Sequence, residues 1–446
     1  MKKKLILTFL LFVGILQAQE QKQNYSFSLE QAIEHAIQNN YSAIRASKDI
    51  DAAKQKKWET TAAGLPQINA SLDYQNNFEL QKSVVPAEFF GGNPGEFTEV
   101  AFGTRHNMVA NGRLSQLIFD GSYIVALQAS KTYLKYYENA KQKTNTEIRE
   151  MVINAYGNVL LAEESIAILE KNKATLSKTL SDTEETYKNG LIEEENVEQL
   201  QITLATINSN LNNTKRLLDV ATKMLKYSLG ISLDADLKLT DKLDNLSMSN
   251  MDIALNSNGF SVAENIDYQM IKNLEEQRSL ELKLQKSKAL PSLAANVNFG
   301  YNAFNDQFAF FTQNQKWLNY SNLGVSLNVP IFSSFGRKAK TQQAKIALDQ
   351  AKIQLTEVEQ QLQLQYEKAK SEFEFSIEEY ATAKSNLNLA ERIEKKQQIK
   401  FTEGLSSSFD FSEAQRQLYS AQQNYLQSMV NIINKKATLE KIINKN

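Results

Sequence analysis

Long stretches of the chain carry apolar residues at alternating spacings of three and four positions. The clearest run is Ile148, Val152, Ala155, Val159, Ala162, Ile166 and Leu169. This spacing aligns the side chains on one face of an α-helix and is typical of a coiled-coil seam. It predicts a helix from about Phe119 to Gly190, which would extend roughly 100 Å at the usual rise per residue. A helix returning from Gly190 is predicted by a second run, Val197, Leu200, Leu204, Ile207, Leu211, Leu218, Ala221 and Leu225.

Two segments in each half of the chain alternate apolar and polar residues instead. In the first half the apolar positions are Ile68, Ala70, Leu72 and Tyr74, and then Met108, Ala110, Gly112 and Leu114. In the second half they are Leu293, Ala295, Val297, Phe299 and Tyr301, and then Leu323, Val325, Leu327, Val329 and Ile331. A period of two predicts strands with one apolar and one hydrophilic face. Pro66 and Pro291 precede the first strand of each half, where a missing N–H ends a helix and does least harm to a strand.

The order of these elements is repeated, which indicates an internal duplication. Each half begins with a helical segment, about 28 to 63 and 264 to 288, and the first opens with Ser28 and Gln31 in the spacing of a capping box. A strand pair and a long helical hairpin follow in each half. Phe119 and Gly190 are 71 residues apart, and Phe332 and Gly404 are 72 apart. The loop between the strands is 12 residues longer in the first half. Repeats of this length and register rarely arise by chance.

Composition favours elongated helices over several globular domains. Apolar residues make up 42% of the 446 residues, yet the mean hydropathy is −0.43. Fifty basic and fifty-one acidic residues leave a formal charge of −1, so no global field would attract nucleic acid. The chain has no cysteine, and its two histidines, His35 and His106, have no nucleophile or metal-ligand pattern beside them. We therefore expect no enzymatic activity, no cofactor and no metal site.

The first 18 residues have the pattern of an export signal. Lysines precede an apolar run from Leu5 to Leu16, and Ala18 stands at a suitable cleavage position. The run is short for a membrane span, so an uncleaved anchor is the less favoured alternative. No other apolar run is long enough for a transmembrane helix. A membrane-inserted part would therefore be built from strands.

Two strand pairs in one chain cannot close a barrel, so several chains must share a sheet. In a closed barrel in lipid, the apolar faces would point outward and the Asn, Ser, Gln and Asp side chains would line a wet lumen. The aromatic residues around the second loop would suit an interfacial girdle: Phe304, Phe308, Phe310, Phe311, Trp317 and Tyr320. The alternative is that these aromatics form the core of a soluble β-sandwich.

Several motifs recur in a characteristic order: LEQAIEHAIQNN, the paired GLPQI and ALPSL, SQLIFDG with its counterpart NVPIFSSFG, and the tips YKNGL and FTEGL. Together they resemble the TolC-like outer membrane efflux protein family, the outer membrane factors, over essentially the whole sequence from about Ser28. The resemblance implies a mixed α/β membrane protein and a homotrimer. Each protomer would give four strands to a shared twelve-stranded β-barrel, and long antiparallel helical hairpins would form a periplasmic α-barrel.

The resemblance also implies the function and the organisation of the chain. It predicts an exit duct in the outer membrane of a Gram-negative bacterium, in contact with outer membrane lipid. The partners would be a periplasmic adaptor (membrane fusion) protein and an inner-membrane pump of a tripartite efflux or type I secretion system. The expected segments are a signal peptide (1–18), a first repeat (19–228), an equatorial linker (229–263), a second repeat (264–430) and an equatorial tail (431–446).

Candidate site residues follow from the family pattern around the two hairpin tips. Asp410 and Glu413 match acids near the periplasmic aperture, and their spacing places both on one helix face; the alternative is that they are ordinary solvated acids. The positions that match closing contacts between helices are Asn196, Phe401 and Ser406. None of these three is charged, so closure would depend on packing. The adaptor-docking tips would be Gly190, Leu191, Gly404 and Leu405, although glycine is also an ordinary helix stop.

A structural or adaptor protein is the competing function. An exported coiled-coil rod could bridge envelope layers without conducting, and its helices would have the same pattern. The strands distinguish the two, because a rod needs no alternating strands with polar inner faces. The sequence does not indicate which cargo is transported.

Overall fold

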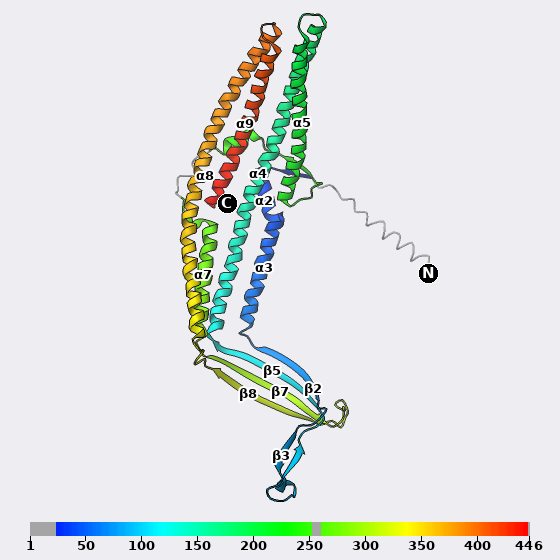
Figure 1. The fold of residues 1–446 in the computed structure, drawn as a ribbon, viewed down its shortest axis with the longest axis vertical. Helices are drawn as coiled ribbons and strands as arrows, with labels where there is room; N and C mark the ends of the chain where they lie inside the picture. The colour runs from blue at the N-terminus through cyan, green and yellow to red at the C-terminus, as the bar shows by residue number, and fades with distance from the viewer. Residues whose placement is uncertain (1–23, 252–259, 445–446) are drawn as a thin grey trace, which may run out of the picture. The chain divides into compact units, whose positions relative to one another are not determined.

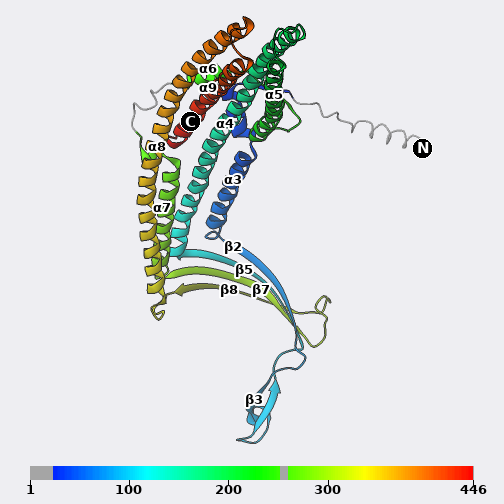
Figure 2. The same cartoon turned by 45° about the horizontal axis from the view of Figure 1, so that its top comes forward.

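The structure is a computed structural model, and it describes residues 24–251 and 260–444. The predicted signal peptide lies outside the described residues. The described chain divides into two compact units. Figures 1 and 2 draw its helices and strands from two directions. The first unit draws on residues up to 50, 137–272 and 354 onward, and the second on residues 51–136 and 273–353. Helices α3, α4, α7 and α8 contribute residues to both units.

The described elements confirm the predicted duplication. In chain order they are β1 (Asn24–Phe27), α2 (Leu29–Asn39), α3 (Tyr41–Ala62), β2 (Gln67–Asn76), β3 (Lys82–Pro86), η1 (Ala87–Phe90), β4 (Phe97–Ala101), β5 (His106–Asp120), α4 (Gly121–Lys188), α5 (Glu194–Leu229), β6 (Asp236–Leu239), α6 (Leu243–Ser249), η3 (Val262–Glu264), α7 (Ile266–Ser287), β7 (Ser292–Asn305), β8 (Trp317–Asn328), α8 (Gly336–Thr402) and α9 (Ser408–Ile442). Some details differ from the prediction. The first helical segment breaks at Asn40, β8 ends before Pro330, and the loop after β2 contains a hairpin, β3–β4.

Two long helical hairpins, α4–α5 and α8–α9, make up most of the first unit. The predicted seam residues Ile148, Val152 and Val159 of α4 are buried, as are Leu200 and Ile207 of α5. A cluster of buried aliphatic residues, mostly leucines, joins α4 to α5, and it includes Phe411 of α9. Figure 1 shows the two hairpins side by side. The heptad-like spacing therefore has its predicted role, which is to bury one apolar face of each helix.

Tyr156 of α4 is fully buried in the main hydrophobic core of the first unit and also makes polar contacts there. The Tyr156 hydroxyl donates to the Phe27 carbonyl oxygen and to Asp241 Oδ2, both at 3.0 Å. The same Asp241 oxygen accepts from the Leu29 N–H at 2.7 Å, at the start of α2. Ser28 and Gln31 form the predicted capping box. Burial raises the pKa of Tyr156, so this hydroxyl remains a donor at neutral pH.

Asn40 explains why the first helical segment is broken. Its side chain is buried, its amide donates to the Ser228 carbonyl oxygen at 2.8 Å, and its Oδ1 accepts from the Ser42 N–H at 2.8 Å. Asn side chains compete with the helical backbone for hydrogen bonds in this way. The break joins the start of α3 to the end of α5. No periodicity signals such a contact, because it depends on a residue almost 200 positions away.

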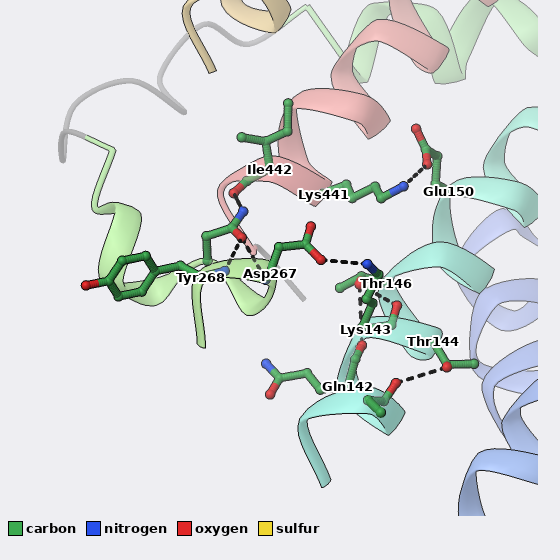
Figure 3. A network of polar contacts seen from close by, with 11 residues as sticks. Gln142, Lys143, Thr144, Thr146, Glu150, Asp267, Tyr268, Lys441 and Ile442 are labelled. Atoms are coloured by element: carbon green, nitrogen blue, oxygen red, sulfur yellow. Dashed lines mark hydrogen bonds and ion pairs between the residues drawn. The ribbon is translucent and has the colours of Figure 1, made fainter. Parts of the chain in front are cut away.

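The end of α9 is fixed by a polar network (Figure 3). Asn265 donates to the Ile442 carbonyl oxygen at 2.8 Å, and its Oδ1 caps α7. Lys441 pairs with Glu150 of α4 at 2.9 Å, and Lys143 pairs with Asp267 at 2.7 Å. The helix α9 passes position 431 without interruption and ends at Ile442.

The second unit contains an antiparallel sheet with the strand order β2-β5-β7-β8. Its register aligns Tyr74, Met108, Ala303 and Trp317 in one cross-strand row. The four predicted strands are therefore neighbours in one sheet, and β2 and β8 are its edges. A separate two-stranded hairpin, β3–β4, follows β2.

Helix α4 contains a more apolar stretch than expected, since no second run long enough to span a membrane was predicted. Helix α4 contains an 18-residue window that could cross a membrane by length and composition, and half of that window is buried within the structure. Val152, Tyr156 and Val159 of α4 belong to the core of the first unit. Core packing thus gives this helix a reason to be apolar without lipid.

Candidate functional site

The four-stranded sheet has one face that is almost entirely apolar. Successive rows on this face are Ala303 with Trp317, Tyr301 with Asn319, Phe299 with Ser321, Val297 with Leu323, Ala295 with Val325 and Leu293 with Leu327. Many side chains on this face are exposed to solvent: Leu323 and Leu327 on β8 are 71% and 65% exposed, and Leu72 on β2 is 62% exposed. Such a continuous apolar face does not suit contact with water, since soluble monomers rarely expose large contiguous patches.

The opposite face of the sheet is lined by amides. The Tyr320 hydroxyl donates to Asn111 Oδ1 at 2.9 Å, and Asn298 donates to Asn322 Oδ1 at 2.9 Å. Arg113 donates to Asn296 Oδ1 at 2.9 Å. Gly300 lies under the Tyr320 ring, and a Cβ at this position would come within 3.1 Å of that ring. This hydrophilic face can line a wet lumen, because amides bind water and repel neither sign of charge.

Aromatic residues gather at one end of the apolar face. Tyr74 and His106 are hydrogen-bonded at 2.8 Å, and Tyr74 makes edge contacts with Phe308 and Phe310. Phe310 is buried against Met108 and Ala303, so the loop after β7 folds over this end of the sheet. Not all of the residues predicted for the aromatic girdle lie on the apolar face. The strand alternation puts Phe304 and Tyr320 on the polar face, because Phe304 pairs with Asn107 and Tyr320 with Gly300.

The two hairpin tips turn through glycine. Gly190 has φ +73° and Gly404 has φ +72°, a region that residues with a Cβ rarely adopt. The next residues project into solvent, as Leu191 is 75% exposed and Leu405 is 78% exposed. Apolar side chains at such exposure are available for contact with another molecule.

Asp410 and Glu413 lie in the first turns of α9, and both have local partners. Asp410 completes a capping box with Ser407: its Oδ2 accepts from the Ser407 hydroxyl at 2.8 Å, and its N–H donates to that hydroxyl at 3.1 Å. Glu413 forms an ion pair with Arg416 one turn further on. Asp410 is exposed and Glu413 is half-buried. The cap gives Asp410 a structural role that needs no aperture.

Phe401, Ser406 and Asn196 each make a contact within one chain. The Phe401 ring stacks on Phe411 with the centroids 5.3 Å apart and the planes 11° from parallel. The Ser406 hydroxyl donates to Gln397 Oε1 at 3.2 Å. Asn196 Oδ1 accepts from the Ser408 N–H at 3.3 Å, which joins the first turn of α5 to the first turn of α9. The structure thus brings Asn196 to the second hairpin.

Phe411 is the residue at this site that sequence reasoning missed. It is fully buried in the cluster that joins α4 to α5, and its ring stacks on the ring of Phe401. It directly follows Asp410, and the sequence analysis considered only the acidic residues of this segment. The signal that could have found it is its three-residue spacing to Ala414, a member of the predicted α9 seam.

Two partly buried titratable groups lie further along the second hairpin. Burial raises the pKa of Glu394 on α8, and a hydrogen bond from Gln415 opposes part of that increase. Burial also raises the pKa of Tyr419 on α9, and the charge of Glu394 adds to the effect. Among residues 24–251 and 260–444, no group of three or more His, Asp or Glu side chains is placed to hold a metal ion.

Comparison with known proteins identifies the fold. Residues 264–445 match the family described as outer membrane efflux protein, which confirms the resemblance that the motifs indicated. No curated protein matches the chain.

Solved structures match nearly the whole chain. CusC superposes with a TM-score of 0.76 at 16% identity, covering 95% of this chain and 95% of CusC. The outer membrane protein VceC from Vibrio cholerae gives a TM-score of 0.71 at 15% identity, covering 93% and 96%. The Campylobacter jejuni CmeC outer membrane channel gives 0.71 at 16% identity, covering 96% and 90%. The chain therefore has the fold of these proteins, including the half that precedes residue 264.

Proposed function

We propose that this protein is the outer membrane channel of a tripartite efflux or type I secretion system. The observation that carries the proposal is the two-faced sheet. One face is apolar and exposed, and the other is lined by amides. A sheet of this kind is stable when lipid covers the apolar face and water fills the space beside the polar one.

A homotrimer closes the sheet. One chain supplies four strands with free edges at β2 and β8, and open edges are not tolerated in lipid. Three copies give twelve strands, with β8 of one protomer paired to β2 of the next. Leu293 and Ala303 mark the ends of the apolar band and lie ten residues apart on β7. That length is about 33 Å along a strand and about 25 Å across the membrane at the usual tilt.

The helices also have faces suited to neighbouring copies. The side of α5 away from its own seam exposes Leu217, Val220, Met224 and Tyr227, again at spacings of three and four. A groove between α8 and α9 is lined by Phe375, Leu389 and Ile393, which are exposed in one chain. Packing the α5 stripe of one protomer into the α8–α9 groove of the next would bury both and close a helical tunnel in the periplasm.

The hairpin tips are the proposed docking and closing elements. Leu191 and Leu405, exposed beyond their glycines, would contact a periplasmic adaptor that is coupled to an inner-membrane pump. Asp410 and Glu413 would form acidic rings near the aperture. Phe401, held on Phe411, would help to keep neighbouring helices packed. Transport through such a duct requires a lumen and a gate, and no catalytic step is part of the proposal.

The competing function is a coiled-coil rod that bridges envelope layers. Such a rod accounts for the helical seams, but it has no use for an exposed apolar sheet face opposite an amide-lined one. The outer membrane channel accounts for both.

Assembly tests this proposal. The protein purified from outer membranes in mild detergent is expected to begin near Gln19, to run as an SDS-resistant trimer that dissociates on heating, and to conduct ions in planar bilayers. Intact mass, crosslinking and single-channel recording are the measurements. A stable monomer that needs no detergent would overturn the barrel and favour the rod.

A further inference from the structure

A single cation lies within the four strands of the sheet. Among residues of β2, β5, β7 and β8, Arg113 is the only lysine or arginine, and the acids are Asp73 and Asp120. Asp120 is the last residue of β5 and its carboxylate accepts from the Ser122 N–H at 2.6 Å, so it serves the start of α4. The remaining polar positions are mainly amides and hydroxyls.

Neutral groups surround Arg113. Its row in the sheet contains Asn69 on β2 and Asn298 on β7, and its Nη2 donates to Asn296 Oδ1 at 2.9 Å. The side chain is exposed, and it makes no ion pair within the described residues. The guanidinium is a permanent cation, so this position carries a full positive charge.

Arg113 lies on the amide-lined face. The residues beside it on β5, Gly112 and Leu114, belong to the apolar alternation, and Asn111 on the same face accepts from the Tyr320 hydroxyl. If that face lines the lumen, as the proposed function requires, three-fold symmetry turns Arg113 into a ring of three guanidinium groups. A ring of like charges around a narrow wet path concentrates counter-ions and repels ions of its own sign.

We propose that Arg113 shifts the ion selectivity of this channel's barrel toward anions, and that cargo carrying carboxylate or phosphate groups is drawn past it. The inference rests on the proposed function. Asp73 lies on the same face but at a different level of the sheet, so it does not neutralise Arg113 directly. It pairs in register with Val109, four residues along β5 from Arg113, which is about 13 Å away along the strand. Over that distance salt screens most of the attraction between exposed charges.

The test is ion selectivity of reconstituted trimers under a tenfold KCl gradient. Arg113→Gln should lower the chloride-to-potassium permeability ratio by roughly twofold, because three charges that face the lumen are removed. Arg113→Lys should keep the wild-type ratio, and Arg113→Glu should lower it further. Asn69→Ser, in the same row, is the matched control and should change little.

A second variant neutralises the charge of Arg113 without removing the guanidinium. Asn296→Asp places a carboxylate against Arg113 and should lower the permeability ratio as Arg113→Gln does. Inorganic tripolyphosphate added to the bath should block wild type and Arg113→Lys at lower concentrations than either neutralised variant.

The outcomes separate the two proposals. If wild type conducts and neither Arg113→Gln nor Asn296→Asp moves the permeability ratio or the tripolyphosphate block, Arg113 has no such role while the channel function stands. If wild type forms no conducting trimer, the proposed function fails and this inference fails with it.

Discussion

The helical hairpins and the sheet bury their apolar residues in different ways. Seam residues such as Val152 and Leu200 are buried inside one chain, whereas Leu72 and Leu323 on the sheet remain open. Helices satisfy their own backbone hydrogen bonds and can pair with the next helix along the chain. A strand at the edge of a sheet cannot satisfy its own backbone hydrogen bonds, and an apolar sheet face must be covered by a second layer or by lipid. The hairpins are thus a folded unit in one protomer, while the sheet is complete only in an assembly.

Charging the apolar face should have the largest effect. Leu323→Arg would place a guanidinium near the middle of the apolar band, which costs about 2–4 kcal/mol per chain in a membrane barrel. We expect loss of the SDS-resistant trimer from outer membranes. Asn322→Arg, on the adjacent lumen-facing position, should assemble normally. Equal assembly of both variants would mean that the two faces do not differ as proposed.

Truncating the helical seam should have a similar but locally confined effect. Leu200 is fully buried between α4 and α5, so Leu200→Ala should destabilise that hairpin by about 2–5 kcal/mol. Ile202→Ala, on the exposed side of the same helix, should cost much less. Limited proteolysis of the trimer should show faster cleavage in the first hairpin only for Leu200→Ala. If Ile202→Ala is as damaging, the exposed side of α5 is an interface as important as the seam.

Removing the Phe401 ring should loosen the tip. Phe401 is half-buried on Phe411, so Phe401→Ala should cost about 1–2 kcal/mol and raise the open probability of the isolated trimer. Phe409→Ala, which removes an exposed ring nearby, is the control. Raising ionic strength should not open wild type beyond the conductance expected from the bath. Opening by salt alone, with Phe401→Ala still closed, would point to an ionic lock in place of packing.

Removing the tip acids should have the smallest effect. Asp410→Asn with Glu413→Gln should raise the chloride-to-potassium permeability ratio by roughly twofold, as charged rings act only over a short screened range. Because Asp410 also caps α9, Ser407→Ala is needed beside it: this variant weakens the cap and keeps both charges. A reversal potential that changes equally with Ser407→Ala would assign the effect to the cap.

Much of the fold was predictable because it depends on periodicity. The seams of α4 and α5, the four strands and the Ser28 capping box follow from local spacing. The break at Asn40, the stacking of Phe401 on Phe411 and the network around Asn265 depend on partners distant in the chain, which periodicity does not record. The tip residues came from a family resemblance. The structure adds local partners to them, above all the cap that Asp410 provides.

Disulfide trapping between β2 and β8 tests the shared barrel most directly. The chain has no cysteine, so introduced pairs have no background. Within one protomer β5 and β7 separate these edges, at about 14 Å, which no disulfide can span. We would combine Ser71→Cys with a cysteine at Asn322, Gly324 or Ser326 on β8 and oxidise the protein in outer membranes. The account predicts a covalent trimer for at least one pair and none for either single cysteine. Monomers from every pair, in protein that still folds and reaches the outer membrane, would contradict it.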